Sequence, residues 1–224
     1  MKPSIIYKKN FWNKKILNWE QQRYKHGNWG STIRYRKEIA LETLKPFVKN
    51  MRILELGCGS GHTAQELINY GAKSYTGLDF SSVAINEASN NLKELISGNK
   101  IQYKEDSCKN LQNYEYDIVF SLGLLDWLDS EEIENLFNQS QNKKFLHSFS
   151  EDRNSLQQYF HKIFIYLTYN KKQRIYTPNY HSSEEINSLS HNNTYFIRDS
   201  RLSFGTFFTN LEDCLLYTSP SPRD

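Results

Sequence analysis

A short apolar run that ends in glycines is the feature that most constrains the fold of this chain. Residues 53–56 have the composition of a buried strand, and Gly57, Gly59 and Gly61 follow before helical spacing begins at Ala64. Glycine adopts positive φ and lets a ligand approach the backbone closely. A strand that turns into a helix through such a loop predicts a ligand site, because the helix N-terminus carries unpaired N–H donors.

Strands and helices alternate along the rest of the sequence. This order is typical of a parallel sheet with right-handed crossovers and helices on both faces. The fold class we expect is therefore α/β: a Rossmann-like, doubly wound, mostly parallel seven-stranded sheet with an antiparallel last strand. The predicted strands are 53–56, 74–78, 100–104, 116–120, 145–149, 195–197 and 206–208, and the last two form an antiparallel pair across Gly205.

Helical spacing also predicts several helices. Residues 10–48 read as helix with a break at Gly27–Gly30, and this segment is too short to bury a core of its own. We expect it to form an N-terminal helical cap. Asp129 with Glu132 predicts a capping box at the start of a helix, and residues 156–167 predict an amphipathic helix.

The spacing of the glycines separates this loop from other nucleotide-binding loops. A dinucleotide fingerprint needs a glycine at position 62, which is His62, and no phosphate loop of the Gly-x₄-Gly-Lys-Ser/Thr type is present. The order from Glu55 to Gly61, acidic-x-Gly-x-Gly-x-Gly, resembles the first motif of the class I S-adenosylmethionine-dependent methyltransferases. The resemblance spans roughly residues 50–150.

Two further acids stand where this family has them. Asp79 ends the second predicted strand, where a carboxylate can accept both ribose hydroxyls of a nucleoside. Asp106 ends the third, where the family places an acid that accepts from the adenine amino group. The resemblance implies S-adenosylmethionine as cofactor and a cofactor-binding set of Glu55, Gly57, Cys58, Gly59, Gly61, Asp79, Phe80, Asp106, Ser107 and Ser121. Cys58 and Cys108 lack Cys-x-x-C spacing, so we expect no metal site.

Each acid also has a purely structural alternative. Glu55 holds the loop or the methionine amine, or is a solvated loop acid. Asp79 could instead cap the next helix, and Asp106 could be a turn residue. Asp126 could orient or deprotonate an acceptor, or only cap or pair. We assign no catalytic residue, although His147, His161 and His181 are possible bases and Tyr24 or Arg34 could meet the cofactor carboxylate.

The acceptor is the least constrained part of the prediction. The Asn-Pro-Pro-Tyr motif of base-amine methylation is absent. Residues 150–210 resemble small-molecule methyltransferases, distantly those acting on a porphyrin carboxylate, and basic residues at 171–174 could attract a carboxylated or phosphorylated acceptor. We predict methyl transfer to an oxygen or nitrogen of a small-molecule or glycan acceptor. The alternatives are a nicotinamide-dependent oxidoreductase and a non-catalytic methyltransferase-like binding module.

Composition adds few constraints on partners and location. The net charge of +3 is spread over scattered basic residues, so a nucleic-acid partner is unlikely. No apolar run approaches the roughly 20 residues that span a bilayer, and the start has no signal-peptide core, so we expect a cytoplasmic protein. Its oligomeric state is unknown from the sequence.

The sequence divides into three predicted parts. Residues 1–48 form the helical cap, and residues 49–213 form the cofactor-binding methyltransferase domain. Residues 214–224 resemble, letter for letter, one reading frame of an adapter used to prepare sequencing libraries, so we expect them to be a non-native tail.

Overall fold

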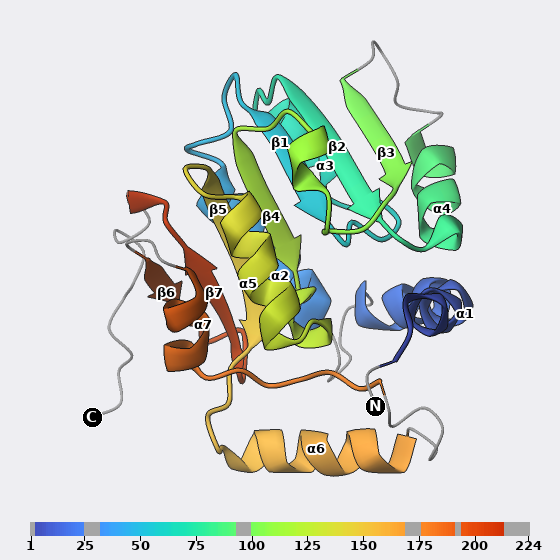
Figure 1. Cartoon of the computed structure of the whole chain (residues 1–224), viewed down its shortest axis with the longest axis vertical. Coiled ribbons are helices and arrows are strands. Elements are labelled where there is room, and N and C mark those ends of the chain that lie inside the picture. The colour runs from blue at the N-terminus through green and yellow to red at the C-terminus, as the bar shows by residue number, and fades with distance from the viewer. Residues whose placement is uncertain (1–2, 25–31, 93–99, 169–175, 191–193, 213–224) are drawn as a thin grey trace.

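The protein is built on one seven-stranded sheet (Figure 1). The computed structural model describes residues 3–24, 32–92, 100–168, 176–190 and 194–212. The sheet has the order β3-β2-β1-β4-β5-β7-β6. Its strands are β1 (Arg52–Leu56), β2 (Ser74–Asp79), β3 (Ile101–Glu105), β4 (Ile118–Leu122), β5 (Lys144–Ser150), β6 (Tyr195–Ile197) and β7 (Gly205–Thr209).

The strand directions confirm the predicted fold class. Strands β1 to β5 pair in parallel, and β7 runs antiparallel to both β5 and β6. The register places Leu56 of β1 opposite Leu78 of β2 and Ser121 of β4. The carboxyl ends of these strands therefore meet at one edge of the sheet, which is where ligands bind in open α/β folds.

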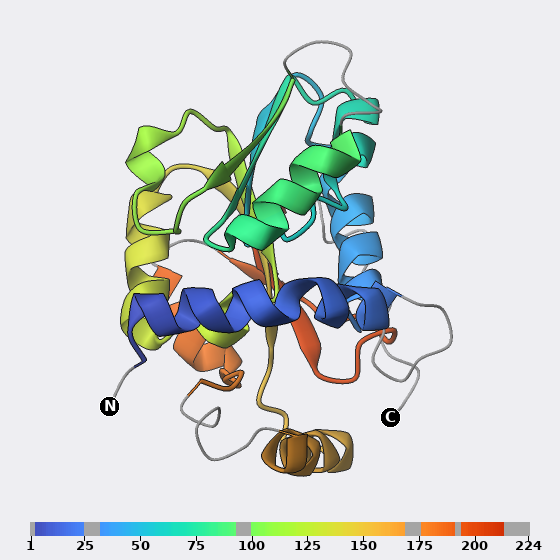
Figure 2. The same ribbon diagram turned by 90° about the vertical axis from the view of Figure 1, so that its right-hand side faces the viewer.

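Helices cover both faces of the sheet, as Figure 2 shows with the sheet seen nearly edge-on. On one face, α2 (Thr32–Leu44) and α3 (Ala64–Asn69) bury Ile53, Tyr75 and Phe120. On the other, α5 (Ser130–Gln139) and α7 (Ser183–Ser190) bury Leu54, Val119 and Phe145. The alternation of Ile53 and Leu54 between the two cores follows from the two-residue period of a strand. Helix α4 (Ser82–Leu92) packs against β2 and β3.

Two helices lie outside these layers. Helix α1 (Ile5–Tyr24) crosses the edge of the sheet to which the parallel strands point (Figure 2), so the predicted N-terminal helix is present. Helix α6 (Leu156–Thr168) stands apart from the sheet at the bottom of Figure 1. None of the helices in the described ranges is long and apolar enough to cross a membrane.

Several local predictions can be compared with the structure. The capping box is confirmed, because Asp129 accepts from the Glu132 backbone N–H at 3.0 Å and Glu132 accepts from that of Asp129 at 3.3 Å. Strand β4 begins two residues later than predicted, because Asp117 lies before it and accepts from the Arg52 backbone at 2.8 Å. Helix α7 was not predicted. The predicted break at 27–30, the basic segment 171–174 and the tail 214–224 lie outside the described residues.

Candidate cofactor site

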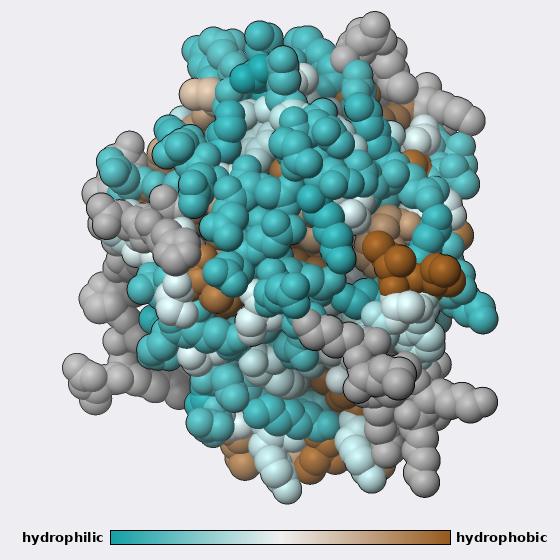
Figure 3. Space-filling model, in the orientation of Figure 1, coloured by the Kyte–Doolittle hydropathy of each residue, from teal (hydrophilic) through white to brown (hydrophobic). Residues whose placement is uncertain are grey.

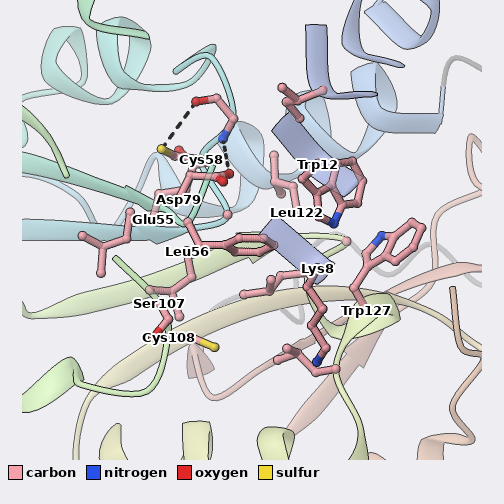
Figure 4. Close-up of a pocket in the computed structure, with 18 of the residues that line it drawn as sticks. Lys8, Trp12, Glu55, Leu56, Cys58, Asp79, Ser107, Cys108, Leu122 and Trp127 are labelled. Carbon is pink, nitrogen blue, oxygen red and sulfur yellow. Dashed lines mark hydrogen bonds between the residues drawn. The ribbon is translucent and has the colours of Figure 1, made fainter. Parts of the chain in front are cut away.

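A pocket lies where α1 crosses the carboxyl edge of the sheet. Figure 4 shows Trp12 and Trp127 on one side of it and Cys58 and Asp79 on the other. Most of the predicted cofactor residues line this pocket. The lining residues include Trp12, Ile16, Trp19, Glu20 and Tyr24 from α1, and Glu55, Gly57, Cys58, Gly59, Asp79, Phe80, Asp106, Ser107, Leu122, Gly123 and Leu124 from the edge of the sheet.

The glycine loop has the conformation that its sequence predicts. Gly57, Gly59 and Gly61 have φ values of +67°, +53° and +78°, a region that side chains with a Cβ rarely adopt. The backbone N–H groups of Gly57 and Cys58 donate to the carbonyl oxygen of Leu78 at 2.8 and 3.0 Å. The loop is therefore tied to β2, and the absence of a Cβ on its glycines leaves room for the side chains of Leu124, Glu20 and Tyr103 beside it.

Asp79 is buried at the end of β2. Its Oδ2 accepts from the Gly59 N–H at 3.1 Å, and its Oδ1 accepts from the Ser81 N–H at 2.8 Å. Burial raises the pKa of Asp79 to about 6, although the two backbone hydrogen bonds oppose this shift. Ser81, whose hydroxyl accepts from the Ala84 N–H at 3.2 Å, caps the helix that follows. Asp79 is thus left with free acceptor capacity beside the pocket.

Glu55 is buried in β1 and accepts hydrogen bonds from the hydroxyls of Thr63 and Tyr75. Burial raises its pKa to about 8, and the two hydroxyl donors lower it only in part. The side chain therefore joins the start of α3 to β2. Its burial does not match a solvated loop acid.

The third predicted acid lies next to Asp79. The Asp106 N–H donates to the Asp79 carbonyl oxygen at 3.1 Å, and the Asp106 carboxylate accepts from Ser107 N–H at 2.7 Å and from the Tyr114 hydroxyl at 2.5 Å. Cys58 is buried, and burial raises the pKa of its thiol well above the usual value. Cys58 is therefore a neutral thiol in the pocket wall.

The sequence analysis missed Glu20, which α1 places on the glycine loop. This buried carboxylate accepts from the Ser60 N–H at 3.1 Å and from the Ser60 hydroxyl, and His62 Nε2 lies 3.7 Å away. A Cβ on Gly59, whose φ is +53°, would come within 2.0 Å of Glu20 Oε1, so glycine is favoured there. A signal for Glu20 existed: it stands on the apolar face of α1, one turn after Ile16 and two turns after Trp12.

Two predicted cofactor residues do not line the pocket. Ser121 is buried on the face covered by α5, and its hydroxyl lies 2.9 Å from His147 Nδ1. The other ring nitrogen of His147 has no hydrogen-bond partner among the described residues, and burial lowers the His147 pKa to about 3. Gly61 accepts from the Tyr103 hydroxyl at 3.1 Å. The structure thus brings neither Ser121 nor His147 to the pocket.

Of the remaining candidate residues, only Tyr24 lines the pocket. Asp126 is buried in an ion pair with Arg36 at 3.1 Å and accepts from the Ser150 N–H at 2.6 Å, which is the pairing alternative. Arg34 pairs with Glu38 at 3.2 Å and does not line the pocket, whereas Tyr24 does. His161 Nδ1 lies 2.6 Å from the Tyr180 hydroxyl, and His181 Nε2 lies 3.0 Å from the Leu125 carbonyl oxygen.

The sheet, the glycine loop and the acid-lined pocket define a Rossmann-like fold whose pocket lies at the edge where such folds bind ligands. Comparison with known protein families shows which family this part of the chain resembles. Residues 53–142 match the family model described as "Methyltransferase domain". Over these residues the chain is similar to methyltransferase domains, which agrees with the predicted resemblance to the class I S-adenosylmethionine-dependent methyltransferases.

A curated relative matches the same part of the chain. The malonyl-[acyl-carrier protein] O-methyltransferase of Bacillus anthracis is 34% identical over 94 residues, which is 40% of this chain and 33% of the relative. The chain thus spans about a third of the length of the curated relative that it matches.

Solved structures share the fold over a longer range. The magnesium protoporphyrin IX methyltransferase from Synechocystis PCC 6803 with bound SAH superposes with a TM-score of 0.70 at 18% identity, covering 92% of this chain and 98% of that one. The cyclopropane synthase MmaA2 from Mycobacterium tuberculosis superposes with a TM-score of 0.58 at 16% identity, covering 74% and 61%. At these identities the likeness shows the shared fold.

Proposed function

We propose that the protein binds S-adenosylmethionine in this pocket. It transfers the methyl group of this cofactor to an oxygen or nitrogen of a small-molecule or glycan acceptor. The observation that carries this proposal is Asp79. It is a buried carboxylate at the end of β2, held by two backbone N–H groups and lining the pocket. A carboxylate in this position suits a ribose, whose two hydroxyls it can accept together.

The other residues of the edge suit the remaining parts of the cofactor. Gly57 and Gly59 give the loop the positive φ values with which it lines the pocket, and Glu20 and Leu124 lie where their missing Cβ atoms would be. We assign Phe80 to the adenine ring and Asp106 to the adenine amino group, since both line the pocket next to Asp79. Glu55 supports the loop from below through Thr63 and Tyr75.

The charge of the pocket also suits this cofactor, which carries a positive sulfonium and a positive ammonium group. Glu20 and Asp79 form no ion pair with a Lys or Arg among the described residues, whereas Lys8 of the pocket wall pairs with Glu132 at 2.9 Å. We assign Glu20 to the ammonium group, because α1 holds this carboxylate directly over Gly59 and Ser60.

The chain contributes alignment and shielding from water. When bound, the cofactor supplies an electrophilic methyl group, so the protein needs mainly to hold donor and acceptor in line. Trp12 and Trp127, whose ring centroids are 4.8 Å apart, form an apolar wall of the pocket. We assign no general base. The name of the curated relative, an O-methyltransferase, favours oxygen as the acceptor atom.

The predicted division of the chain belongs to this proposal. Residues 49–213 would act as the methyltransferase domain, with residues 1–48 as the cap that supplies Glu20, and residues 214–224 would have no role. We expect this activity in the cytoplasm.

Calorimetry with S-adenosylhomocysteine tests the proposal. The wild type should bind it in the micromolar range and should give no heat with NAD. Asp79→Ala should weaken binding by about 1.5–3 kcal/mol, the scale of hydrogen bonds to a charged group. Glu134→Gln removes an exposed acid on α5 outside the pocket lining and should bind as the wild type does. A wild type that ignores S-adenosylhomocysteine, or that binds NAD, overturns the proposal.

A further inference from the structure

The side of the pocket opposite Asp79 and Cys58 is built from aromatic rings, two of which, Trp12 and Trp127, are labelled in Figure 4. The ring centroids of Trp12 and Trp127 are 4.8 Å apart, and those of Trp127 and Tyr176 are 5.0 Å apart. The indole N–H of Trp12 donates to the Tyr176 hydroxyl at 3.2 Å. These three residues line the pocket and contact one another, so they form one continuous aromatic wall.

Contacts behind the aromatic wall hold it in place. The Asn179 backbone N–H donates to the Asp126 carbonyl oxygen at 2.6 Å, and the Asn179 side chain donates to the Leu128 carbonyl oxygen at 2.9 Å. The two hydrogen bonds fix the chain on either side of Trp127 and join it to the segment that carries Tyr176. A wall that is already ordered binds a ligand without the entropic cost of fixing its side chains.

The aromatic wall contains a hydrogen-bond donor that lacks an acceptor. The Tyr176 hydroxyl accepts from Trp12, but its own proton has no acceptor among the described residues. Burial raises the pKa of Tyr176 above its usual value, so the hydroxyl keeps this proton. A buried donor without an acceptor is costly, and an oxygen atom of a ligand in the pocket would supply the missing acceptor.

The charge of the pocket disfavours an anionic acceptor. Among the described lining residues the cations are Lys8 and Lys109, and both lie near Glu132, at 2.9 and 3.8 Å. Glu20 and Asp79 have no Lys or Arg ion-pair partner in the same described part of the chain. A carboxylated or phosphorylated acceptor would be repelled by these carboxylates, so the pocket suits an uncharged one.

The polar groups of the aromatic wall fit an aromatic acceptor better than a sugar. A sugar carries several hydroxyl groups, and each needs a hydrogen-bond partner when it is buried. The wall offers the Tyr176 hydroxyl and the Trp127 indole N–H, which are enough for a flat ring that bears one hydroxyl. Other residues that line the pocket are apolar: Ile16, Ile33, Leu122, Leu124 and Leu128.

The pocket meets solvent beside the first turn of α1. Ile5 lines the pocket and is 55% exposed, and the neighbouring Ile6 is 69% exposed. In Figure 3 brown atoms lie on the right of the molecule, where Figure 1 places α1. An apolar acceptor therefore meets an apolar surface at this entrance.

We infer that the aromatic wall is the subsite of the methyl acceptor, and that this acceptor is a flat, uncharged phenol whose oxygen accepts a hydrogen bond from Tyr176. Such a bond favours the phenolate, which is the stronger nucleophile. In the reaction the oxygen bonds to the methyl carbon, the bond from that carbon to sulfur breaks with its electron pair left on sulfur, and the phenol proton leaves to water. The role as methyl acceptor rests on the proposed function, whereas the binding of a phenol to this wall does not.

Equilibrium dialysis of the full chain with naphthol, a flat phenol, tests this inference. The wild type should bind naphthol equally well with and without saturating S-adenosylhomocysteine, and more tightly than the anion naphthoate or methyl glucoside. Tyr176→Phe should weaken naphthol binding by about threefold to tenfold, the range of a neutral hydrogen bond, and should leave the binding of naphthalene unchanged. Tyr159→Phe removes an exposed hydroxyl on α6 outside the pocket lining and should bind naphthol as the wild type does.

Three outcomes overturn the inference. One is a folded wild type that does not bind naphthol. Another is displacement of naphthol by S-adenosylhomocysteine, because naphthol would then occupy the cofactor side of the pocket. The third is a Tyr176→Phe variant that binds naphthol as the wild type does, or that loses naphthol and naphthalene equally, since Tyr176 would then have only a structural role. A wild type that binds naphthol but not S-adenosylhomocysteine would instead contradict the proposed function and support the phenol site.

Discussion

Two sets of buried carboxylates in this molecule have opposite surroundings. At the pocket edge, Glu55 and Asp79 are hydrogen-bonded only to hydroxyl and backbone N–H groups, and burial raises their pKa values to about 8 and about 6. In the β5–β7 half, Glu151 lies 2.5 Å from Arg198 and 2.7 Å from Arg153. Burial alone would raise the Glu151 pKa, but hydrogen bonds from the two arginines, Ser183 and Thr206 hold it well below the usual value.

The difference separates a carboxylate whose counter-charges lie within the fold from carboxylates that have no such counter-charge among the described residues. Glu151 has its cations within the chain, so its charge is neutralised when the protein folds. Asp79 and Glu20 have no Lys or Arg ion-pair partner among the described residues, so a cationic or hydroxyl-bearing ligand gains interactions there that the free protein lacks.

The largest expected effect comes from removing the paired acid. Glu151→Ala removes the buried carboxylate that Arg153 and Arg198 share. Because these arginine side chains are 26% and 51% exposed, we expect a loss in the free energy of unfolding of about 3 kcal/mol, the low end for a broken buried pair. Urea denaturation measures this change. Glu134→Ala, which removes an exposed acid on α5, serves as the control and should cost under about 0.5 kcal/mol. Equal losses in the two variants would contradict the structural role of Glu151.

The next effect is a pH dependence of stability at Glu55. Its pKa is about 8 in the folded protein and near 4.5 when exposed, so the folded state favours the protonated form and stability falls as pH rises between these values. Glu55→Gln removes this dependence. The free energy of unfolding of the wild type, relative to the variant, should therefore fall by on the order of 2–4 kcal/mol from pH 5 to pH 8. Parallel urea curves at the two pH values measure it, and a constant difference would refute the prediction.

A smaller effect is expected at the glycine loop. Gly59→Ala forces a Cβ into positive φ and against the Glu20 carboxylate, and we expect a loss of about 1–3 kcal/mol in stability. Thermal unfolding measures it. The double variant Gly59→Ala/Glu20→Ala should recover part of the loss, because the carboxylate that the new Cβ meets is gone. Strictly additive losses would show that α1 does not rest on this loop.

The smallest effect on stability is expected for an ion pair that is partly exposed to solvent. Arg34 and Glu38 form a partly exposed pair one helical turn apart in α2, at 3.2 Å. Glu38→Gln should change the free energy of unfolding by less than about 0.5 kcal/mol, since solvent screens such pairs. A loss as large as that of Glu151→Ala would mean that exposure of the carboxylate, which is 38% in Glu38 and 7% in Glu151, does not separate the two ion pairs.

The sequence predicted the features that depend on residues close together in the chain. The glycine loop, the acids at the ends of β2 and β3 and the capping box of α5 depend on neighbouring residues, and the structure has them where the spacing predicts. The alternation of strands and helices also determined the sheet class. Contacts between segments far apart in the chain could not be predicted from the sequence. The contact of Glu20 with Ser60, for example, depends on where α1 crosses the sheet.

The same limit explains the other differences. The apolar spacing of α6 predicts an amphipathic helix, but its outward orientation follows from the contacts of Gln158 with Glu151, just after β5, and of His161 with Tyr180, before α7. Ser121 stands in a segment that approaches the pocket, yet the two-residue period of β4 turns its side chain to His147 and the core. Helix α7 was not predicted because it buries only Ile186 and Ser190, so its sequence shows no clear helical spacing of apolar residues.

The place of β7 between β5 and β6 has a consequence for biosynthesis. Strand β5 ends at Ser150, and the strand that pairs with its free edge begins at Gly205, about 55 residues later. At a synthesis rate of about 5–20 residues per second, the nascent chain carries the open edge of β5 for roughly 3–11 s before its partner is made. During that interval the nascent chain has an unpaired strand edge. Until β7 is made, only a chaperone can keep this edge from pairing with another chain.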